Sequence, residues 1–189
     1  IQNKKYNSVK HYFNENGFDC FEKLICYGNA SIIETPSRYD FIEFGDLVIC
    51  RSITMQFKFK NNKQFVEKVT FRFNADNLIE SLAFTLTDIA QHDIMDNEDW
   101  SRDSKITLLT FMEDYQTAYA LKRIDYLEQI FSDNALIITG RVVKVRKSEI
   151  VPTGNKIIYT SQTKQQYLDN LKRAFRANSY IKIGRASCR

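Results

Sequence analysis

The sequence predicts an α+β protein, in which an N-terminal antiparallel β-meander precedes a segment of helix, helix, strand, strand and helix. Three observations indicate this architecture. Apolar and polar residues alternate over much of the first half, apolar residues recur every three or four positions from about residue 104, and a polar, acidic stretch separates the two patterns. We therefore expect a strand-rich region with a flanking helix over 1–95, a linker over 96–100 and a second domain over 101–182.

The meander is predicted from segments with a period of two, joined by short Asn-rich turns. In "SITMQFKFK" every second residue is large and apolar, and "QFVEKVTFRF" and "LIESLAFTL" repeat the pattern. The turns "NNK" and "NADN" contain Asn, which tolerates the left-handed conformation of tight hairpin turns. "FIEFGDLVIC" adds a strand before them, with its turn at Gly45 and Asp46. We expect the polar face of this sheet to be in contact with water.

The second half opens with an amphipathic helix over about 104–123. Leu108, Met112, Tyr115 and Tyr119 recur at steps of four and three, so that one helical face is apolar and aromatic. Because this spacing places the side chains on a single face, the helix is expected to pack that face against the rest of the domain.

Two shorter helices are indicated by capping-box spacing, in which two side chains bind free backbone amides at a helix start. Asp125 and Glu128 have this spacing before a short apolar helix, and Thr163 and Gln166 have it before "YLDNLKRAF". Between them, "ALIITGRVVKV" and "KIIYTS" are rich in β-branched residues and predict two strands.

The composition argues against several classes of function. A net charge of +4 is too small to indicate a nucleic-acid-binding protein. The four cysteines show no C-x-x-C spacing and the chain has two histidines, which together give no metal-site pattern. No run approaches the roughly 18 apolar residues of a membrane helix. We therefore expect no metal, no cofactor, no nucleic acid and no membrane span.

The last seven residues, "IGRASCR" over 183–189, read like the translation of a common sequencing-library adapter. We expect them to be a non-native tail, with the natural chain continuing past Lys182 in another sequence. Because this tail contains two arginines and one cysteine, the remaining chain has a net charge of +2 and three cysteines.

The stretch "YQTAYALKRIDYLEQIFSDNALIITG", residues 115–140, resembles the opening of the nuclear transport factor 2-like, or SnoaL-like, superfamily. The resemblance covers about residues 101–182, and nearly the whole chain for bacterial proteins that carry a strand-rich N-terminal region. It implies a cone of helices packed on a strongly curved sheet around a pocket, of which this chain would contain only the N-terminal part. Asp125 and Asp133 match the capping and turn positions of the superfamily.

Such a truncated cone has a physical consequence. Two strands with three helices cannot close it, so we expect the apolar faces of "ALIITGRVV" and "KIIYTS" to lack partner strands and to leave an unpaired edge.

The resemblance also frames the expected function. Some relatives are isomerases, dehydratases or epoxide hydrolases that use an interior Asp, His or Tyr, and many others only bind a ligand or a partner. In this chain Tyr115, Tyr119 and Met112 are the candidate pocket-lining residues. No residue is assigned as catalytic, because no His follows His92 and core packing explains Tyr on an apolar stripe.

We expect a non-catalytic module that binds a small ligand or a protein, in a bacterial protein exported to the cell envelope, with homodimerisation of the full-length protein. The alternative is an isomerase or dehydratase whose catalytic Asp or His lies on strands beyond this chain. A third hypothesis is binding of a nucleic acid or an anionic surface, for which solubilising charges are the simpler explanation. Its residues would be Arg141, Lys144, Arg146, Lys147, Lys172, Arg173 and Arg176.

Overall fold

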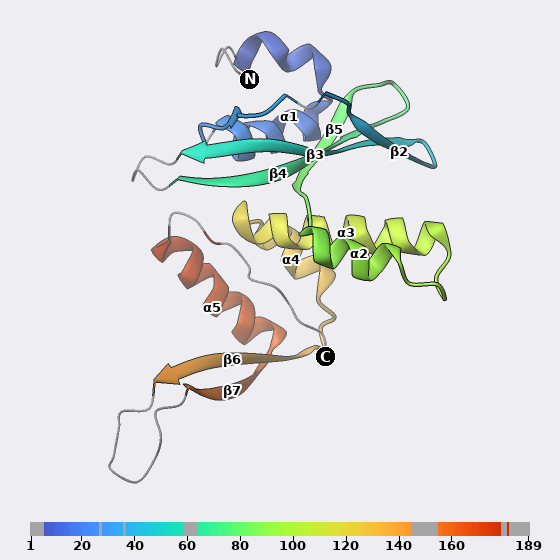
Figure 1. Cartoon of the computed structure of the whole chain (residues 1–189). Coiled ribbons are helices and arrows are strands. Elements are labelled where there is room, and N and C mark those ends of the chain that lie inside the picture. Colours follow the sequence, from blue (N-terminus) through green and yellow to red (C-terminus); the bar gives the residue numbers. More distant parts are fainter. Residues whose placement is uncertain are drawn as a thin grey trace. The chain divides into compact units, whose positions relative to one another are not determined.

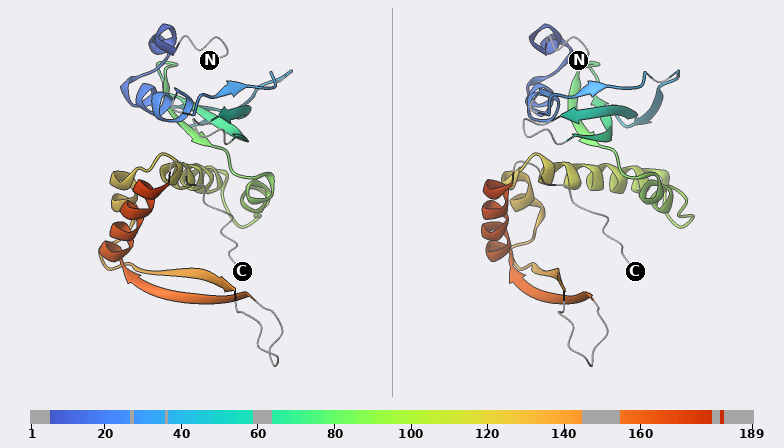
Figure 2. Two further views of the ribbon diagram at one scale, coloured as in Figure 1. Left: turned by 90° about the vertical axis from the view of Figure 1, so that its left-hand side faces the viewer. Right: turned by 60° about the vertical axis from the view of Figure 1, so that its left-hand side comes forward.

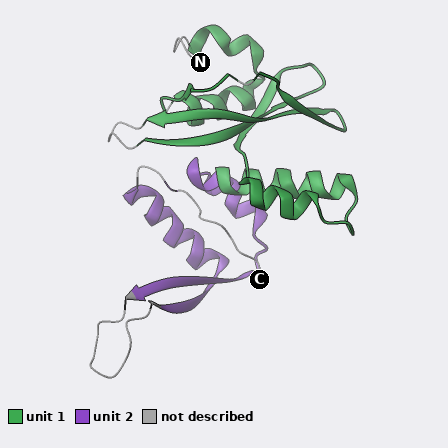
Figure 3. Ribbon diagram, viewed as in Figure 1, with its two compact units in different colours: residues 1–117 green, residues 118–189 purple. Residues whose placement is uncertain are grey.

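The computed structural model describes residues 6–26, 28–35, 37–58, 64–144, 155–178 and 181. It divides into two compact units, residues 1–117 and 118–189 (Figure 3). Both units combine helices with antiparallel strands, so the protein has the predicted α+β fold. The predicted linker over 96–100 lies between two helices of unit 1, and its role as a domain boundary stays a prediction.

Unit 1 is built on one five-stranded antiparallel sheet (Figure 1). Its elements are η1 (Tyr6–Tyr12), α1 (Glu15–Phe21), η2 (Glu22–Cys26), β1 (Ser31–Ile32), β2 (Asp40–Phe44), β3 (Leu47–Lys58), β4 (Gln64–Phe73), β5 (Ile79–Phe84), α2 (Asp88–Met95) and most of α3 (Arg102–Ala120). The strands β3, β4 and β5 pair in sequence as a meander, and β2 and β1 both pair with the other side of β3.

The two faces of this sheet are covered by different helices, with α1 on one side and α2 and α3 on the other (Figures 1 and 2). The face toward α1 is apolar and includes Met55, Phe57 and Val69, each at most 1% exposed. The rings of Phe57 and Phe84 meet edge to face, with centroids 5.4 Å apart. This layer is the main hydrophobic core of unit 1.

Helix α1 packs so closely on β5 that the contact leaves no room for a side chain on the helix. A Cβ atom built on Gly17 would lie 1.9 Å from the carbonyl oxygen of Ile79, so only glycine fits there. Asn14 secures the same junction, because its backbone N–H donates to Ile79 O at 3.1 Å and its side chain accepts the Gly17 N–H at 2.8 Å. The first residue of β5 is therefore hydrogen-bonded to the residue that precedes α1.

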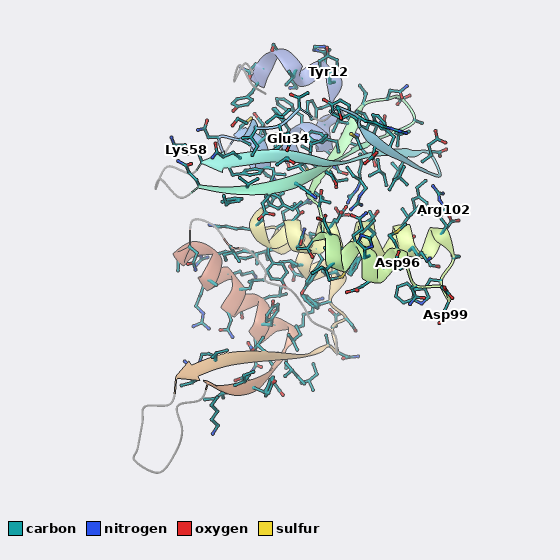
Figure 4. All side chains as sticks on the ribbon, in the orientation of Figure 1. Tyr12, Glu34, Lys58, Asp96, Asp99 and Arg102 are labelled. Atoms are coloured by element: carbon teal, nitrogen blue, oxygen red, sulfur yellow. The ribbon has the colours of Figure 1, made fainter. Side chains whose placement is uncertain are left out.

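On the opposite face of the sheet, the expectation that the polar side chains contact water is only partly correct. The polar positions were expected to be in contact with water, which holds for the exposed Lys58 (Figure 4). Thr70 and Arg72 are instead buried, at 0% and 3% exposure. The reason is that α2 and α3 cover the middle of this face and supply the polar partners that these side chains need.

A β-bulge in β3 sets which side chains reach this covered face. The pairing with β4 shifts between Cys50 and Ile53, and Ser52 between them has a left-handed φ of 63°. At the bulge, two residues of β3 lie opposite one residue of β4. The side chains beyond the bulge therefore point to the other face of the sheet from the one that strict alternation predicts. As a result Arg51 lies on the helix-covered face, although Ile53 two residues later lies on the other.

Unit 2 contains the end of α3, α4 (Ile124–Ile130), β6 (Leu136–Lys144), β7 (Asn155–Thr163) and α5 (Lys164–Ala177). The order of helices and strands is the predicted one. β6 and β7 form a two-stranded antiparallel hairpin, and α5 follows β7 directly and leaves the end of the hairpin at a steep angle to the strands (Figure 2). Buried Leu127 of α4 and Leu168 of α5, both 0% exposed, lie at the centre of the small core of this unit.

One predicted capping box forms and the other does not. Thr163 accepts the Gln166 N–H at 3.3 Å, and Gln166 accepts the Thr163 N–H at 3.0 Å. Asp125 and Glu128 make no such pair, because α4 begins at Ile124 and its N-cap residue has no side-chain cap bond. Asp125 therefore lies inside the first turn, where it accepts a bond from Arg123 at 3.3 Å.

Candidate functional site

The densest group of charged side chains in the described chain is a buried cluster in unit 1, which we call the charge cluster: Arg51, Arg72, Glu113 and Asp114. Arg51 Nη2 donates to Glu113 Oε1 at 2.7 Å, and these side chains are 5% and 1% exposed. Arg72 Nη2 lies 3.6 Å from Glu113 Oε2, and its Nη1 donates to Asp114 Oδ1 at 2.5 Å. Two cations thus meet two adjacent carboxylates beneath the helices.

The cluster joins four elements of unit 1. The bulge in β3 positions Arg51, β4 carries Arg72, and α3 supplies both carboxylates. From α2, Gln91 accepts a second bond from Arg51 at 3.2 Å. The backbone N–H of Leu86 also donates to Glu113 Oε1, at 3.2 Å. The cluster therefore fixes α2 and α3 on the sheet.

The electrostatics of the cluster are those of a buried, compensated network. Burial raises the pKa of Glu113, and the neighbouring Arg51 and Arg72 oppose that rise. Three buried atoms make no hydrogen bond: Arg51 Nε, Arg72 Nε and Glu113 Oε2. An acid or base catalyst must reach its substrate, and a carboxylate that is 1% exposed does not. The geometry indicates a structural role for this cluster.

Metal and thiol chemistry find little support in the part of the chain that the structure describes. Among those residues, no group of three or more His, Cys, Asp or Glu side chains could hold a metal ion. Cys26 and Cys50 are free thiols. Burial, followed by the negative charge of Glu22, raises the pKa of Cys26 to about 11, so this thiol stays protonated at neutral pH. No described helix combines the length and apolarity needed to span a bilayer.

The predicted pocket-lining residues have separate surroundings. Met112 packs against a buried cluster in unit 1 that contains Leu109. Tyr115 stacks on Phe111, with centroids 6.2 Å apart. Tyr119 belongs to unit 2. A pocket lined by all three residues stays a prediction.

Tyr119 belongs to a small aromatic group in unit 2. Its hydroxyl lies 2.6 Å from the hydroxyl of Tyr167, and its ring meets Phe175 edge to face. Because Tyr119 is only 4% exposed, its ring is part of the core of unit 2.

A second candidate site is the uncovered face of the β6–β7 hairpin. The register pairs Ile138 with Ser161, Gly140 with Tyr159 and Val142 with Ile157, so these residues share one face. Its large apolar side chains are 48–69% exposed, and we call them the apolar hairpin face. They are Leu136, Ile138, Val142, Ile157 and Tyr159.

From Leu136 to Val142 and from Ile157 to Thr163, this face of the hairpin contains no charged residue. The basic side chains Arg141 and Lys156 alternate onto the opposite face of the same strands. Contiguous apolar surface of this kind is characteristic of an interaction site. The arrangement agrees with the expectation, from the sequence, of strand faces without partner strands.

The charge cluster was not predicted, because its members are far apart in the sequence. Arg51 and Glu113 are separated by 62 positions, and Arg72 is one of several polar residues in the alternating pattern of its strand. One signal was available. Glu113 and Asp114 follow Met112 in the middle of an amphipathic helix, and a carboxylate at a buried position requires a cationic partner.

No family model, curated protein or solved structure matches this chain. The resemblance of residues 115–140 to the nuclear transport factor 2-like superfamily therefore stays a prediction.

Proposed function

We propose that this protein is a non-catalytic interaction module whose apolar hairpin face binds a protein partner. The finer proposal is that residues 101–182 are the opening part of a nuclear transport factor 2-like cone. Its support is the resemblance over 115–140 together with the order helix, strand, strand, helix in unit 2. The enzyme alternative needs an Asp or His on strands outside this chain.

The observation that carries the proposal is the exposure of the apolar hairpin face. Ile138 and Tyr159 are 61% and 68% exposed, in a fold unit small enough to need every apolar contact it can make. Fully burying one large apolar side chain contributes about 1.5–3 kcal/mol to stability. Each of the five side chains of this face gives up part of that contribution by remaining in water. A protein partner that covers this face recovers the burial, and the remaining strands of the cone are the alternative cover.

The length of the face favours a protein over a small ligand. From Leu136 to Val142 the strand advances by about 20 Å, at roughly 3.3 Å per residue. Small ligands are held in concave sites that surround most of their surface. A hairpin face that presents side chains along its length is suited to a strand, a helix or another sheet.

Site-specific photocrosslinking tests the proposal. A benzophenone amino acid replaces Ile138 in the full chain, and a matched control replaces Thr160, which is exposed on the opposite face of the same hairpin. We expect one defined protein adduct from position 138 in cells and a much weaker one from position 160. Equal yields at both positions, or none at either, would contradict the proposed binding face.

A further inference from the structure

The two edges of the sheet in unit 1 differ in how their backbone is bonded. At one edge, β5 is bonded to Asn14 and Asn16 near its start and to Gln116 and Thr117 at its end. At the other edge, β1 and β2 both pair with β3, and neither pairs with another described strand (Figure 1). An unpaired strand edge is a template on which a further strand can form.

The outward backbone groups of β2 follow from one contact and the register. Arg102 of α3 donates to the backbone carbonyl of Glu43 at 3.0 Å, so this carbonyl points away from β3. Inward and outward groups alternate along an antiparallel strand, so the N–H and carbonyl of Phe41 also point away from β3. Within the described ranges, no other backbone group bonds to them. The edge is therefore open at Phe41.

The same stretch exposes two aromatic rings. Phe41 of β2 is 59% exposed, and Tyr39, which precedes the strand, is 45% exposed. They lie two positions apart, which is the spacing of side chains on one face of a strand. A strand added at this edge would place alternate side chains beside these rings. The edge thus combines free backbone groups with apolar contact area.

The charge of the edge indicates the chemistry of a partner. Three exposed carboxylates lie on β2 and its turn: Asp40, Glu43 and Asp46. The segment between β1 and β2 adds one acid, Glu34, and one base, Arg38, and Arg102 is the base that reaches β2 from α3. The edge therefore keeps an acidic excess, which a basic partner complements.

We propose that this open β2 edge, residues 39–46, binds a basic, extended segment of another protein by strand addition. The segment bonds to the outward N–H and carbonyl of Phe41, and its apolar side chains cover the exposed rings. Its Lys or Arg side chains face the carboxylates, which favours fast encounter and excludes acidic segments. The surface consists of other residues than the apolar hairpin face, so the inference goes beyond the proposed function and does not depend on it.

Fluorescence anisotropy of labelled peptides added to the full chain tests the inference. The main probe is a short peptide that alternates Lys and Val, and we expect it to bind saturably and more weakly in high salt. The same peptide with Glu in place of Lys should bind at least about tenfold more weakly. A basic peptide with N-methylated Val residues cannot form the backbone ladder and should also lose at least about tenfold in affinity.

Two variants at one position separate the ring from the backbone. Phe41→Ala removes the ring and should weaken binding of the basic peptide about tenfold. Phe41→Pro also removes the outward N–H, which makes no bond to β3, so proline is tolerated there and binding should fall by at least about tenfold more. Ile89→Ala, at a position of α2 that is 56% exposed, is the matched control and should bind like the wild type.

Three results would overturn the inference. Equal affinity for the basic and the acidic peptide would show that charge does not select the partner. Unchanged affinity for the N-methylated peptide would exclude strand addition, and this measurement uses the wild-type chain, so it does not depend on the folding of Phe41→Pro. A basic peptide that does not bind saturably would reject the site. The crosslink at position 138 tests the proposed function separately, so the two can fail independently.

Discussion

The guanidinium of Arg51 and the carboxylate of Glu113 form an ion pair of 2.7 Å between strand β3 and helix α3, and both side chains are almost completely buried. Such a pair contributes little net stability compared with well-packed apolar residues, because both charges lose their hydration. Its removal on one side alone is costly, because the remaining charge is then buried without its partner.

We therefore expect Arg51→Met to destabilise unit 1 by about 3–5 kcal/mol, and the double variant Arg51→Met with Glu113→Leu to destabilise it clearly less. The double variant still pairs Arg72 with Asp114. Urea unfolding, followed by the fluorescence of the single tryptophan Trp100, measures the free energy of unfolding of both variants.

Lys23→Met is the matched control for this series. Lys23 pairs with Asp19 at 2.8 Å on the surface of α1, where both side chains are about half exposed. Its loss should cost at most about 1 kcal/mol. A double variant that loses as much stability as Arg51→Met and Glu113→Leu together would show that the two residues are not energetically coupled.

This cluster also shows where reasoning from the sequence alone ends. The meander, the hairpin and the capping box of Thr163 follow from local patterns, because period, turn chemistry and cap spacing are local properties. The burial of Arg72 depends on which helix covers its face. Which helix covers this face is decided by contacts between residues far apart in the sequence, and an alternating pattern within one strand does not reveal them.

The bulge is a second case in which a local pattern misleads. Strict alternation along "CRSITMQF" places Arg51 on the same face as Ile53, whereas the structure places them on opposite faces. The cause is Ser52 in the left-handed region, which a serine seldom adopts and which no residue of this segment signals. Similarly, α4 starts one residue before Asp125, because Lys122 ends α3 with a left-handed turn.

Ser52→Gly should stabilise the bulge. A left-handed conformation costs a side-chain-bearing residue about 1–2 kcal/mol, and glycine adopts it freely but loses more entropy on folding. We expect a net gain of about 0.5–1 kcal/mol by urea unfolding. Thr54→Gly in the same strand is the control and should destabilise the protein by a similar amount. Destabilisation by both variants would show that Ser52 makes contacts that outweigh its strain.

Lys122 combines a left-handed backbone with a capping side chain. Its φ is 58°, and its ammonium group donates to the carbonyl oxygens of Phe175 and Asn178 at the end of α5. Lys122→Met keeps the strain and loses these charge-assisted bonds, which should cost about 1.5–3 kcal/mol. Lys122→Gly loses the same bonds but releases the strain, so it should cost about 1 kcal/mol less.

Amide hydrogen exchange in the last turn of α5 measures the difference between these two variants. Faster exchange in Lys122→Met than in Lys122→Gly is the expected order. The reverse order would mean that the backbone of Lys122 is not strained in solution.

Asp133 gives the protein a specific response to acid. The hydrogen bond from Lys164 at 2.7 Å, followed by the charge of Lys164, lowers the pKa of this carboxyl below its ordinary value. A carboxyl whose pKa is lower in the folded than in the unfolded state favours folding at pH values above its unfolded pKa. This contribution is lost as the pH falls through the folded pKa.

Lys164→Gln should therefore move the pKa of Asp133 upward to the usual value and remove this part of the acid dependence. Carboxyl carbon shifts in an NMR titration of the full chain measure the change. Asp125 is the internal control. Partial burial would raise its pKa, but the amides of Tyr126 and Asp125 and the side chain of Arg123 lower it overall, and none of these contacts involves Lys164. If Asp133 titrates alike in both proteins, the ion pair of 2.7 Å does not persist in solution.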